Sequence, residues 1–148
     1  MTNRDVFADV ILPVPAAGIF TYHVPDSLKD SIAPGLRVIV PFGSKKFYSA
    51  IIRRIHNEPP RGFKTRDIES AIDQYPVVNS YQLNFWQWIS DYYLCTYGEV
   101  MKAAMPAGLK LESETELFLN RIPEEEVTLN SEEIKLIETV RVTNLTIT

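Results

Sequence analysis

Residues 34–55 read PGLRVIVPFGSKKFYSAIIRRI, and this stretch decides the fold. Pro34-Gly35 marks one turn and Pro41-Phe42-Gly43 marks the next. Between and after these turns, Leu36–Val40 and Phe47–Ile55 are rich in β-branched and aromatic side chains. The stretch therefore predicts two neighbouring strands joined by a short connection.

Similar extended runs lie on both sides of this pair. Upstream, Phe7–Leu12 ends at Pro13, and Phe20–Val24 ends at Pro25. Downstream, Asp67–Ile72 is extended and is expected to return to the sheet. The first four short strands, with turn residues between them, predict a small β-barrel-like or strongly bent antiparallel sheet.

The hydrophobic period changes after residue 75. Asn79 or Ser80 can cap a helix over Tyr81–Tyr93, and a second helix is expected over Gly98–Ala104. One broad face of the first helix is expected to carry Leu83, Trp86, Ile89, Tyr92 and Tyr93. We interpret the stripe of Trp86, Trp88, Tyr92 and Tyr93 as core packing between helix and sheet. The fold class is thus α+β, a sheet followed by a short helical subdomain.

Composition divides the chain into three parts. Residues 1–110 form the first domain, β-rich over 1–74 and helical over 75–110. Residues 111–129 are a linker or strand that includes an acidic run, and 130–148 begin a further domain that the chain cuts off. The net charge of −4 arises after residue 111, because residues 112–148 hold 3 basic and 9 acidic side chains.

Basic residues concentrate in one segment. Between Arg37 and Arg66 there are eight cations and one anion, Glu58. They include Lys45, Lys46, Arg53, Arg54, Arg61, Lys64 and Arg66. Cations bind phosphates through the release of counterions, so this segment permits nucleic-acid binding despite the acidic total. Alternatively, these basic residues are simply solvated charges at strand edges and in loops, with no role in binding.

Several classes of function are disfavoured. A single cysteine, Cys95, and two separated histidines argue against a disulfide framework or a metal site. No nucleophile–base constellation and no phosphate-binding Gly-x-x-x-x-Gly-Lys loop can be assembled, so we expect no catalysis by this chain. Without a secretory signal or a long apolar run, we expect a cytoplasmic protein that does not enter membranes.

The order of short motifs resembles the N-terminal region of the primosomal protein N′ (PriA) family of replication-restart helicases. The motifs are ILPVP at 11–15, FTYHVP at 20–25, GLRVIVPFG at 35–43, YPVV at 75–78, SDYY at 90–93, GEV at 98–100 and MP at 105–106. The resemblance covers about Asp9 to Pro106.

This resemblance implies a module that binds the 3′-hydroxyl end of a DNA strand at a stalled or abandoned fork or D-loop, without base preference. It also implies that residues 130–148 open a winged-helix domain. In the full-length parent, an ATP-dependent 3′-to-5′ helicase, a motor and a zinc-binding part would follow. We therefore expect no cofactor in this chain, with ATP, Mg and Zn bound by the absent parts. Other primosome proteins and single-stranded DNA-binding protein are expected partners of the full-length chain.

Carried over residue by residue, the family's terminal-nucleotide pocket falls on Phe20, Thr21, Tyr22, Gly43 and a cation. The cation is Arg66 or Lys64. Some family members have an aspartate where this sequence has Thr21, so a carboxylate contact to the terminal sugar does not carry over, although a hydroxyl can still donate and accept. Lys45, Lys46, Arg53, Arg54 and Arg61 would then form a basic patch for phosphates.

The aromatic residues and the overall function each have alternative interpretations. Phe20 and Tyr22 lie on the same face of a strand and serve either as core or as a stacking platform, as does Phe42 at a strand end. The alternative function is a small β-barrel that binds a peptide through these aromatic side chains, or that docks on the motor. A purely structural N-terminal domain is a third possibility.

Overall fold

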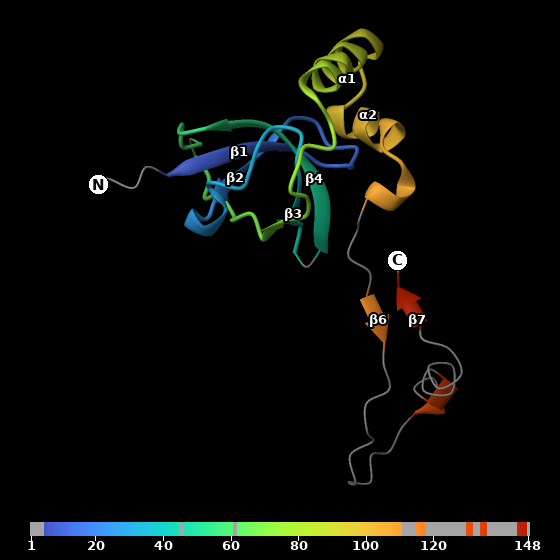
Figure 1. Ribbon diagram of the computed structural model, residues 1–148. Helices are drawn as coiled ribbons and strands as arrows, with labels where there is room; N and C mark the ends of the chain where they lie inside the picture. Colours follow the sequence, from blue (N-terminus) through green and yellow to red (C-terminus); the bar gives the residue numbers. More distant parts are fainter. Residues whose placement is uncertain are drawn as a thin grey trace. The chain divides into compact units, whose positions relative to one another are not determined.

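Five strands form one antiparallel sheet in the order β2-β1-β4-β3-β5 (Figure 1). They are β1 (Val6–Ile11), β2 (Phe20–Val24), β3 (Arg37–Phe42), β4 (Lys46–His56) and β5 (Ser70–Ala71). This computed structural model describes residues 5–44, 46–60, 62–110, 115–117, 130–131, 134–135 and 145–147. The first four strands begin and end within two residues of the predicted ranges, although β3 continues through Pro41, at the predicted turn, to Phe42.

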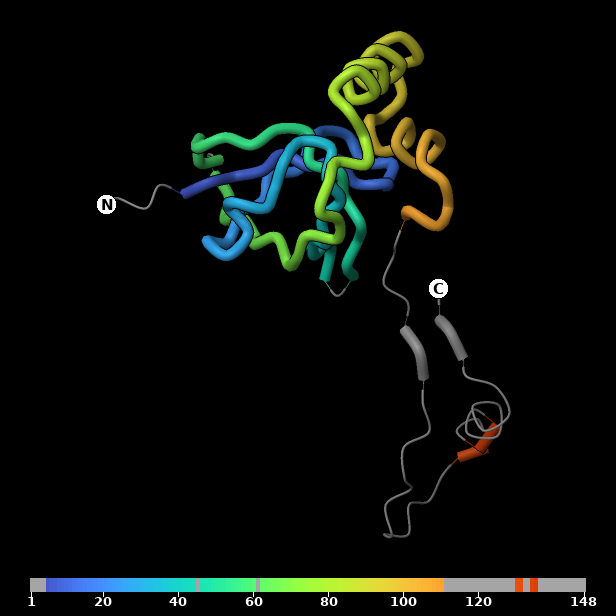
Figure 2. Tube along the Cα trace, in the orientation of Figure 1, coloured from blue at the N-terminus to red at the C-terminus, as the bar shows by residue number. Residues whose placement is uncertain are grey.

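The sheet is open and does not close into a barrel. Its edge strands are β2 and β5, and β5 has only two residues, which pair with Val38 and Ile39 of β3. The segment before β5 nevertheless reaches β2 (Figure 2). The His23 amide donates to the Arg66 carbonyl at 2.9 Å, and the Ile68 amide donates to the His23 carbonyl at 3.0 Å. This segment thus lies beside β2 and forms one wall of the candidate site.

Two apolar clusters hold the sheet and the helices together. The first is on the inner face of the sheet and includes Val10, Val38 and Ile52. The second lies between the sheet and the helices and includes Ile11 and Ile51. Neighbouring residues of β1 and β4 therefore enter opposite clusters, as the period of two in a strand requires. Both faces of these central strands are buried at this point.

Two helices follow the sheet, α1 (Ser80–Tyr93) and α2 (Tyr97–Ala104), and both begin at capping boxes. Asn79 is the N-cap of α1 and Thr96 is the N-cap of α2. Helix α2 approaches the turn after β1 at Gly98, where an added β-carbon would meet the backbone carbonyls of that turn. A glycine is therefore needed for this close contact. Two short 3-10 helices occupy Asp26–Leu28 and Ala107–Leu109.

The prediction that the whole aromatic stripe of α1 packs in the core is wrong. Trp86 is buried with Leu83, but Trp88, Tyr92 and Tyr93 are each more than half exposed. With about 3.6 residues per turn, Tyr92 lies nine positions and half a turn away from Leu83. On the exposed side the rings of Phe85, Trp88 and Tyr92 stack on one another. The following ring, Tyr93, meets Tyr92 edge to face.

A second unit spans Ser113–Thr148, and the first spans Met1–Glu112. In the second unit β6 (Thr115–Leu117) pairs antiparallel with β7 (Leu145–Ile147). Ser131, Ile134 and Lys135 are helical. Most of the predicted linker at 111–129 and most of 130–148 lie outside the described residues, so the winged-helix assignment stays a prediction.

Candidate nucleic-acid interface

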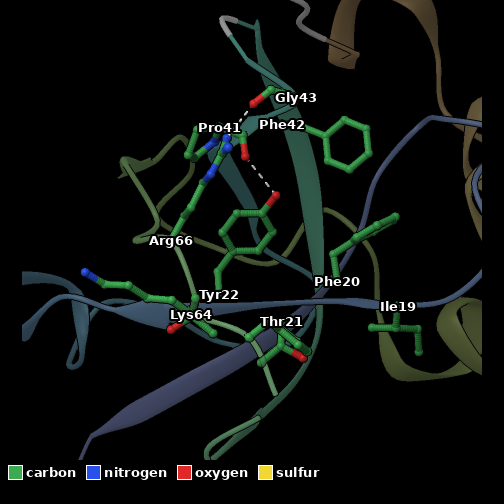
Figure 3. A pocket seen from close by; sticks show the side chains of 11 residues that line it. Ile19, Phe20, Thr21, Tyr22, Pro41, Phe42, Gly43, Lys64 and Arg66 are labelled. Atoms are coloured by element: carbon green, nitrogen blue, oxygen red, sulfur yellow. Dashed lines mark hydrogen bonds between the residues drawn. The ribbon is translucent and has the colours of Figure 1, made fainter. Parts of the chain in front are cut away.

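A cavity of about 290 Å³ opens between β2, the end of β3 and the segment before β5 (Figure 3). Strand β2 contributes residues 20–22, the β3 end contributes Pro41–Gly43, and the third wall is Phe63–Arg66. Ile19 stands at the rim. All six residues that the resemblance assigned to end binding line this one cavity, although they come from three separate segments of the chain.

Two hydrogen bonds tie the walls together at the turn after β3. The Tyr22 hydroxyl donates to the Pro41 carbonyl at 2.9 Å, and Nη1 of Arg66 donates to the Gly43 carbonyl at 2.6 Å. Burial raises the pKa of Tyr22, partly opposed by the positive charge of Arg66, so the hydroxyl remains a donor at neutral pH. Arg66 and Lys64 are both exposed on the same wall, and Arg66 is the one that contacts this turn.

The turn itself presents an open backbone. Gly43 has φ +71°, in the left-handed region that favours glycine. A β-carbon built there would meet nothing within 4 Å. A ligand can therefore approach the backbone at Gly43, and the Gly43 and Pro41 carbonyls each keep an acceptor lone pair beyond the bond described.

Aromatic rings provide the apolar part of the cavity. Phe20 meets Phe42 edge to face, with ring centroids 5.0 Å apart, and Phe42 meets Tyr48 in the same manner at 6.0 Å. These three side chains are partly buried, so Phe20 and Phe42 both pack in the core and line the cavity. Phe63 is 61% exposed and adds a ring that the sequence interpretation did not include.

Thr21 belongs to the opposite face of β2, and its side chain points away from the turn (Figure 3). Its hydroxyl donates to Oδ1 of Asp9 at 2.7 Å. Asp9 also accepts from Arg54, at 3.1 Å from Nε and 2.9 Å from Nη2, and Nε2 of His56 lies 3.2 Å away. The carboxylate missing at position 21 is therefore present one strand away, behind Thr21.

Asp9 remains ionised in this network. Burial would raise the pKa of its carboxyl, but the hydrogen bonds from Thr21, Arg54 and His56 together outweigh burial and hold the pKa below its usual value. The sequence does carry a signal for this group, because Asp9 is the one charged residue in the apolar run Phe7–Leu12. A buried charge needs partners, and the sequence analysis did not predict the partners of Asp9.

The predicted basic patch is divided. Arg53 and Arg54 line a second cavity beside the first, and Lys46 is exposed at the start of β4. Lys45 and Arg61 lie outside the described residues. Near the first cavity the described cations are therefore Lys64 and Arg66 on its wall and the arginine pair next to it.

A family model described as 3′DNA-binding domain (3′BD) matches residues 9–106. The chain belongs to the PriA 3′DNA-binding domain family. The match begins and ends where the sequence resemblance does, and it contains every wall of the cavity. The resemblance to PriA is thus confirmed.

Three curated PriA proteins illustrate the similarity. "Replication restart protein PriA" of Bacillus subtilis (strain 168) is 34% identical over 114 residues, which are 75% of this chain. The proteins of the same name from Haemophilus influenzae (strain ATCC 51907 / DSM 11121 / KW20 / Rd) and Synechocystis sp. (strain ATCC 27184 / PCC 6803 / Kazusa) are 30% and 27% identical over 68% and 79% of this chain. The chain spans about 14% of the length of each of these relatives.

Two further properties of this PriA domain concern the described part of the chain. None of its helices there is long and apolar enough to cross a membrane. No group of three or more potential metal ligands gathers among the same residues.

Proposed function

We propose that this domain holds the terminal nucleotide of a DNA 3′ end in the cavity between β2, the β3 end and the segment before β5. The observation that carries the proposal is the meeting of aromatic rings, an open backbone turn and Arg66 around one cavity. A strand end offers a base, a sugar hydroxyl and a phosphate, and these three groups call for such partners.

Each partner has a distinct role. Phe20, Phe42 and the exposed Phe63 offer apolar surface to the base, and stacking of this kind accepts every base. Arg66 offers its remaining N–H donors to the phosphate that precedes the terminal sugar. Lys64 adds positive charge from the same wall. Binding is therefore independent of base sequence.

The end chemistry follows from the carbonyl groups of the turn. A terminal 3′-hydroxyl can donate a hydrogen bond to the carbonyl of Pro41 or Gly43. A 3′-phosphate has acceptor oxygens in that position, and these would face the acceptor carbonyls of Pro41 and Gly43. The cavity therefore favours a hydroxyl end over a phosphate end.

In the longer protein, this domain would recognise a 3′ end at a stalled or abandoned fork and so support replication restart and primosome assembly. The parent would be an ATP-dependent helicase, with ATP, Mg and Zn bound outside this chain. The other primosome proteins and single-stranded DNA-binding protein would meet it in the cytoplasm. The name "Replication restart protein PriA" of the relatives supports this assignment.

The test is a comparison of two short single strands that differ only in ending with 3′-hydroxyl or 3′-phosphate. Binding is followed by fluorescence anisotropy with the label at the 5′ end. We expect the hydroxyl-ended strand to bind about tenfold tighter, the effect of one hydrogen bond gained and one acceptor clash avoided. Equal affinities for the two strands would overturn the pocket assignment. If the domain instead binds a peptide with an affinity that stays constant as the salt concentration rises, the peptide-binding alternative is favoured.

A further inference from the structure

A second cavity, of about 450 Å³, adjoins the first within the same unit. Its walls include Arg53 and Arg54 from β4, Asp9 from β1 and Gln87 from α1. Ile19 lines both cavities and is 43% exposed. The two cavities therefore meet at one accessible apolar side chain.

A β-bulge brings the two arginines to this cavity. Neighbours on a regular strand point to opposite faces, which would separate Arg53 from Arg54. Asp9 pairs with Arg54 while Val10 pairs with Ile52, so Arg53 is an extra residue on β4. An extra residue redirects side chains locally and commonly does so beside functional sites. Here it gives one cavity two guanidinium groups.

The ion pair with Asp9 leaves Arg54 able to bind an anion. Asp9 accepts from Nε and Nη2, and the guanidinium has further N–H donors on Nη1 and Nη2. The Arg54 side chain is 58% exposed, whereas that of Asp9 is 12% exposed. The buried Asp9 carboxylate thus orients the Arg54 guanidinium, while the N–H groups that it does not bind face solvent.

Arg53 forms the other side of the second cavity, which we call the groove. Its Nη2 lies 3.4 Å from Oδ1 of Asn84, which directs the side chain toward α1. With two cations and one carboxylate on its walls, the cavity is positive on balance. Its size and positive charge suit a sugar–phosphate unit. Phosphates repeat along a DNA strand, so a strand whose end lies in the first cavity can place a further phosphate in this one.

We propose that the nucleotides preceding the terminal one pass over Ile19 and lay their phosphates against Arg53 and Arg54. This inference rests on the proposed function, because it takes the 3′ end to occupy the first cavity. The ligand is single-stranded DNA of any sequence. Ile19 contacts the strand at the passage between the cavities, and the guanidinium groups bind its backbone.

The experiment uses the whole chain with two hydroxyl-ended probes, a thymidine dinucleotide and a thymidine hexanucleotide. The dinucleotide fills the first cavity, whereas the hexanucleotide also reaches the second. We expect Arg54→Gln to weaken hexanucleotide binding about tenfold, as the loss of one charge-assisted phosphate contact would, and dinucleotide binding less than about twofold. Arg53→Gln should act in the same direction. Lys102→Gln removes an equal charge from α2, away from both cavities, and should change neither affinity.

The outcomes separate this inference from the proposed function. If the wild-type chain prefers hydroxyl ends but binds both probe lengths equally, the groove is refuted and the pocket stands. If it shows no preference for hydroxyl ends, the pocket itself fails. Should Arg54→Gln lose dinucleotide binding through disturbance of Asp9, Arg53→Gln decides the matter: an unchanged hexanucleotide affinity overturns the groove, and a selective loss supports it.

Discussion

Replacing Arg66 with glutamine should weaken binding of a 3′-hydroxyl-ended dinucleotide and reduce the salt dependence of that binding. Nη1 of Arg66 is held at 2.6 Å by the Gly43 carbonyl, so the guanidinium is fixed at the rim of the cavity before DNA arrives. A hydrogen bond to a charged group contributes about 1.5–3 kcal/mol. At about 1.4 kcal/mol for each factor of ten, the loss should be at least about tenfold.

The assay is fluorescence anisotropy at several salt concentrations. One phosphate neutralised on a single strand contributes about 0.7 to the slope of log K against log salt, and Arg66→Gln should remove that amount. Lys64→Gln is the matched control, because Lys64 lines the same cavity and is exposed like Arg66, but of the two only Arg66 bonds to the turn in the described part of the chain. It should change affinity by less than about threefold, the range of an exposed charge. An unchanged slope in Arg66→Gln, or a larger loss in Lys64→Gln, would refute the assignment of Arg66 as the phosphate contact.

Three predictions concern stability, each measured by chemical denaturation. Trp86→Ala should cost about 3–5 kcal/mol because the ring is buried, whereas Trp88→Ala, on the exposed side of α1, should cost less than about 1 kcal/mol; similar losses would contradict the helix orientation. Gly98→Ala should cost about 1–3 kcal/mol, since its β-carbon would meet backbone carbonyls, and Gly108→Ala, with open space around it, should be tolerated; equal costs would refute the contact. The lowered pKa of Asp9 stabilises the fold above the unfolded value of 3.8 and is lost as pH falls through the folded value, so Asp9→Asn should destabilise more at pH 7 than at pH 3; a pH-independent cost would contradict this network.

The strands and helix starts were predictable because the residues that end or begin them act locally. Pro13 and Pro25 follow the ends of β1 and β2, and the Asn79 side chain caps α1 through its own neighbours. Whether the sheet would close into a barrel was not predictable. That outcome depends on how far the short β5 pairs across the sheet, which is a matter of tertiary packing.

The site was predictable in part, and only through the family motifs. Phe20, Gly43 and Arg66 lie far apart in the sequence, and no spacing rule brings them together around a cavity. The bulge at Arg53 leaves no signature in residue type, so the sequence indicated a basic patch where the structure forms a groove. The partner of Thr21 was missed because Asp9 meets it across two strands.

The exposed side of α1 is the clearest error, and its cause is general. An aromatic side chain is more often buried than exposed, so composition favours core packing. The helical period places Tyr92 opposite Leu83, and period alone would have separated the two faces. Whether the second face of a helix is covered depends on elements elsewhere in the fold, and in this domain the second face of α1 is exposed.

The most direct test of the central claim is a crystal structure of the chain with a 3′-hydroxyl-ended dinucleotide bound. We predict that the terminal base lies against Phe20 and Phe42, that the 3′-hydroxyl donates to a carbonyl of the turn at Gly43, and that Arg66 contacts the preceding phosphate. A dinucleotide bound elsewhere on the domain, or bound in the cavity with its 5′ end innermost, would contradict the account.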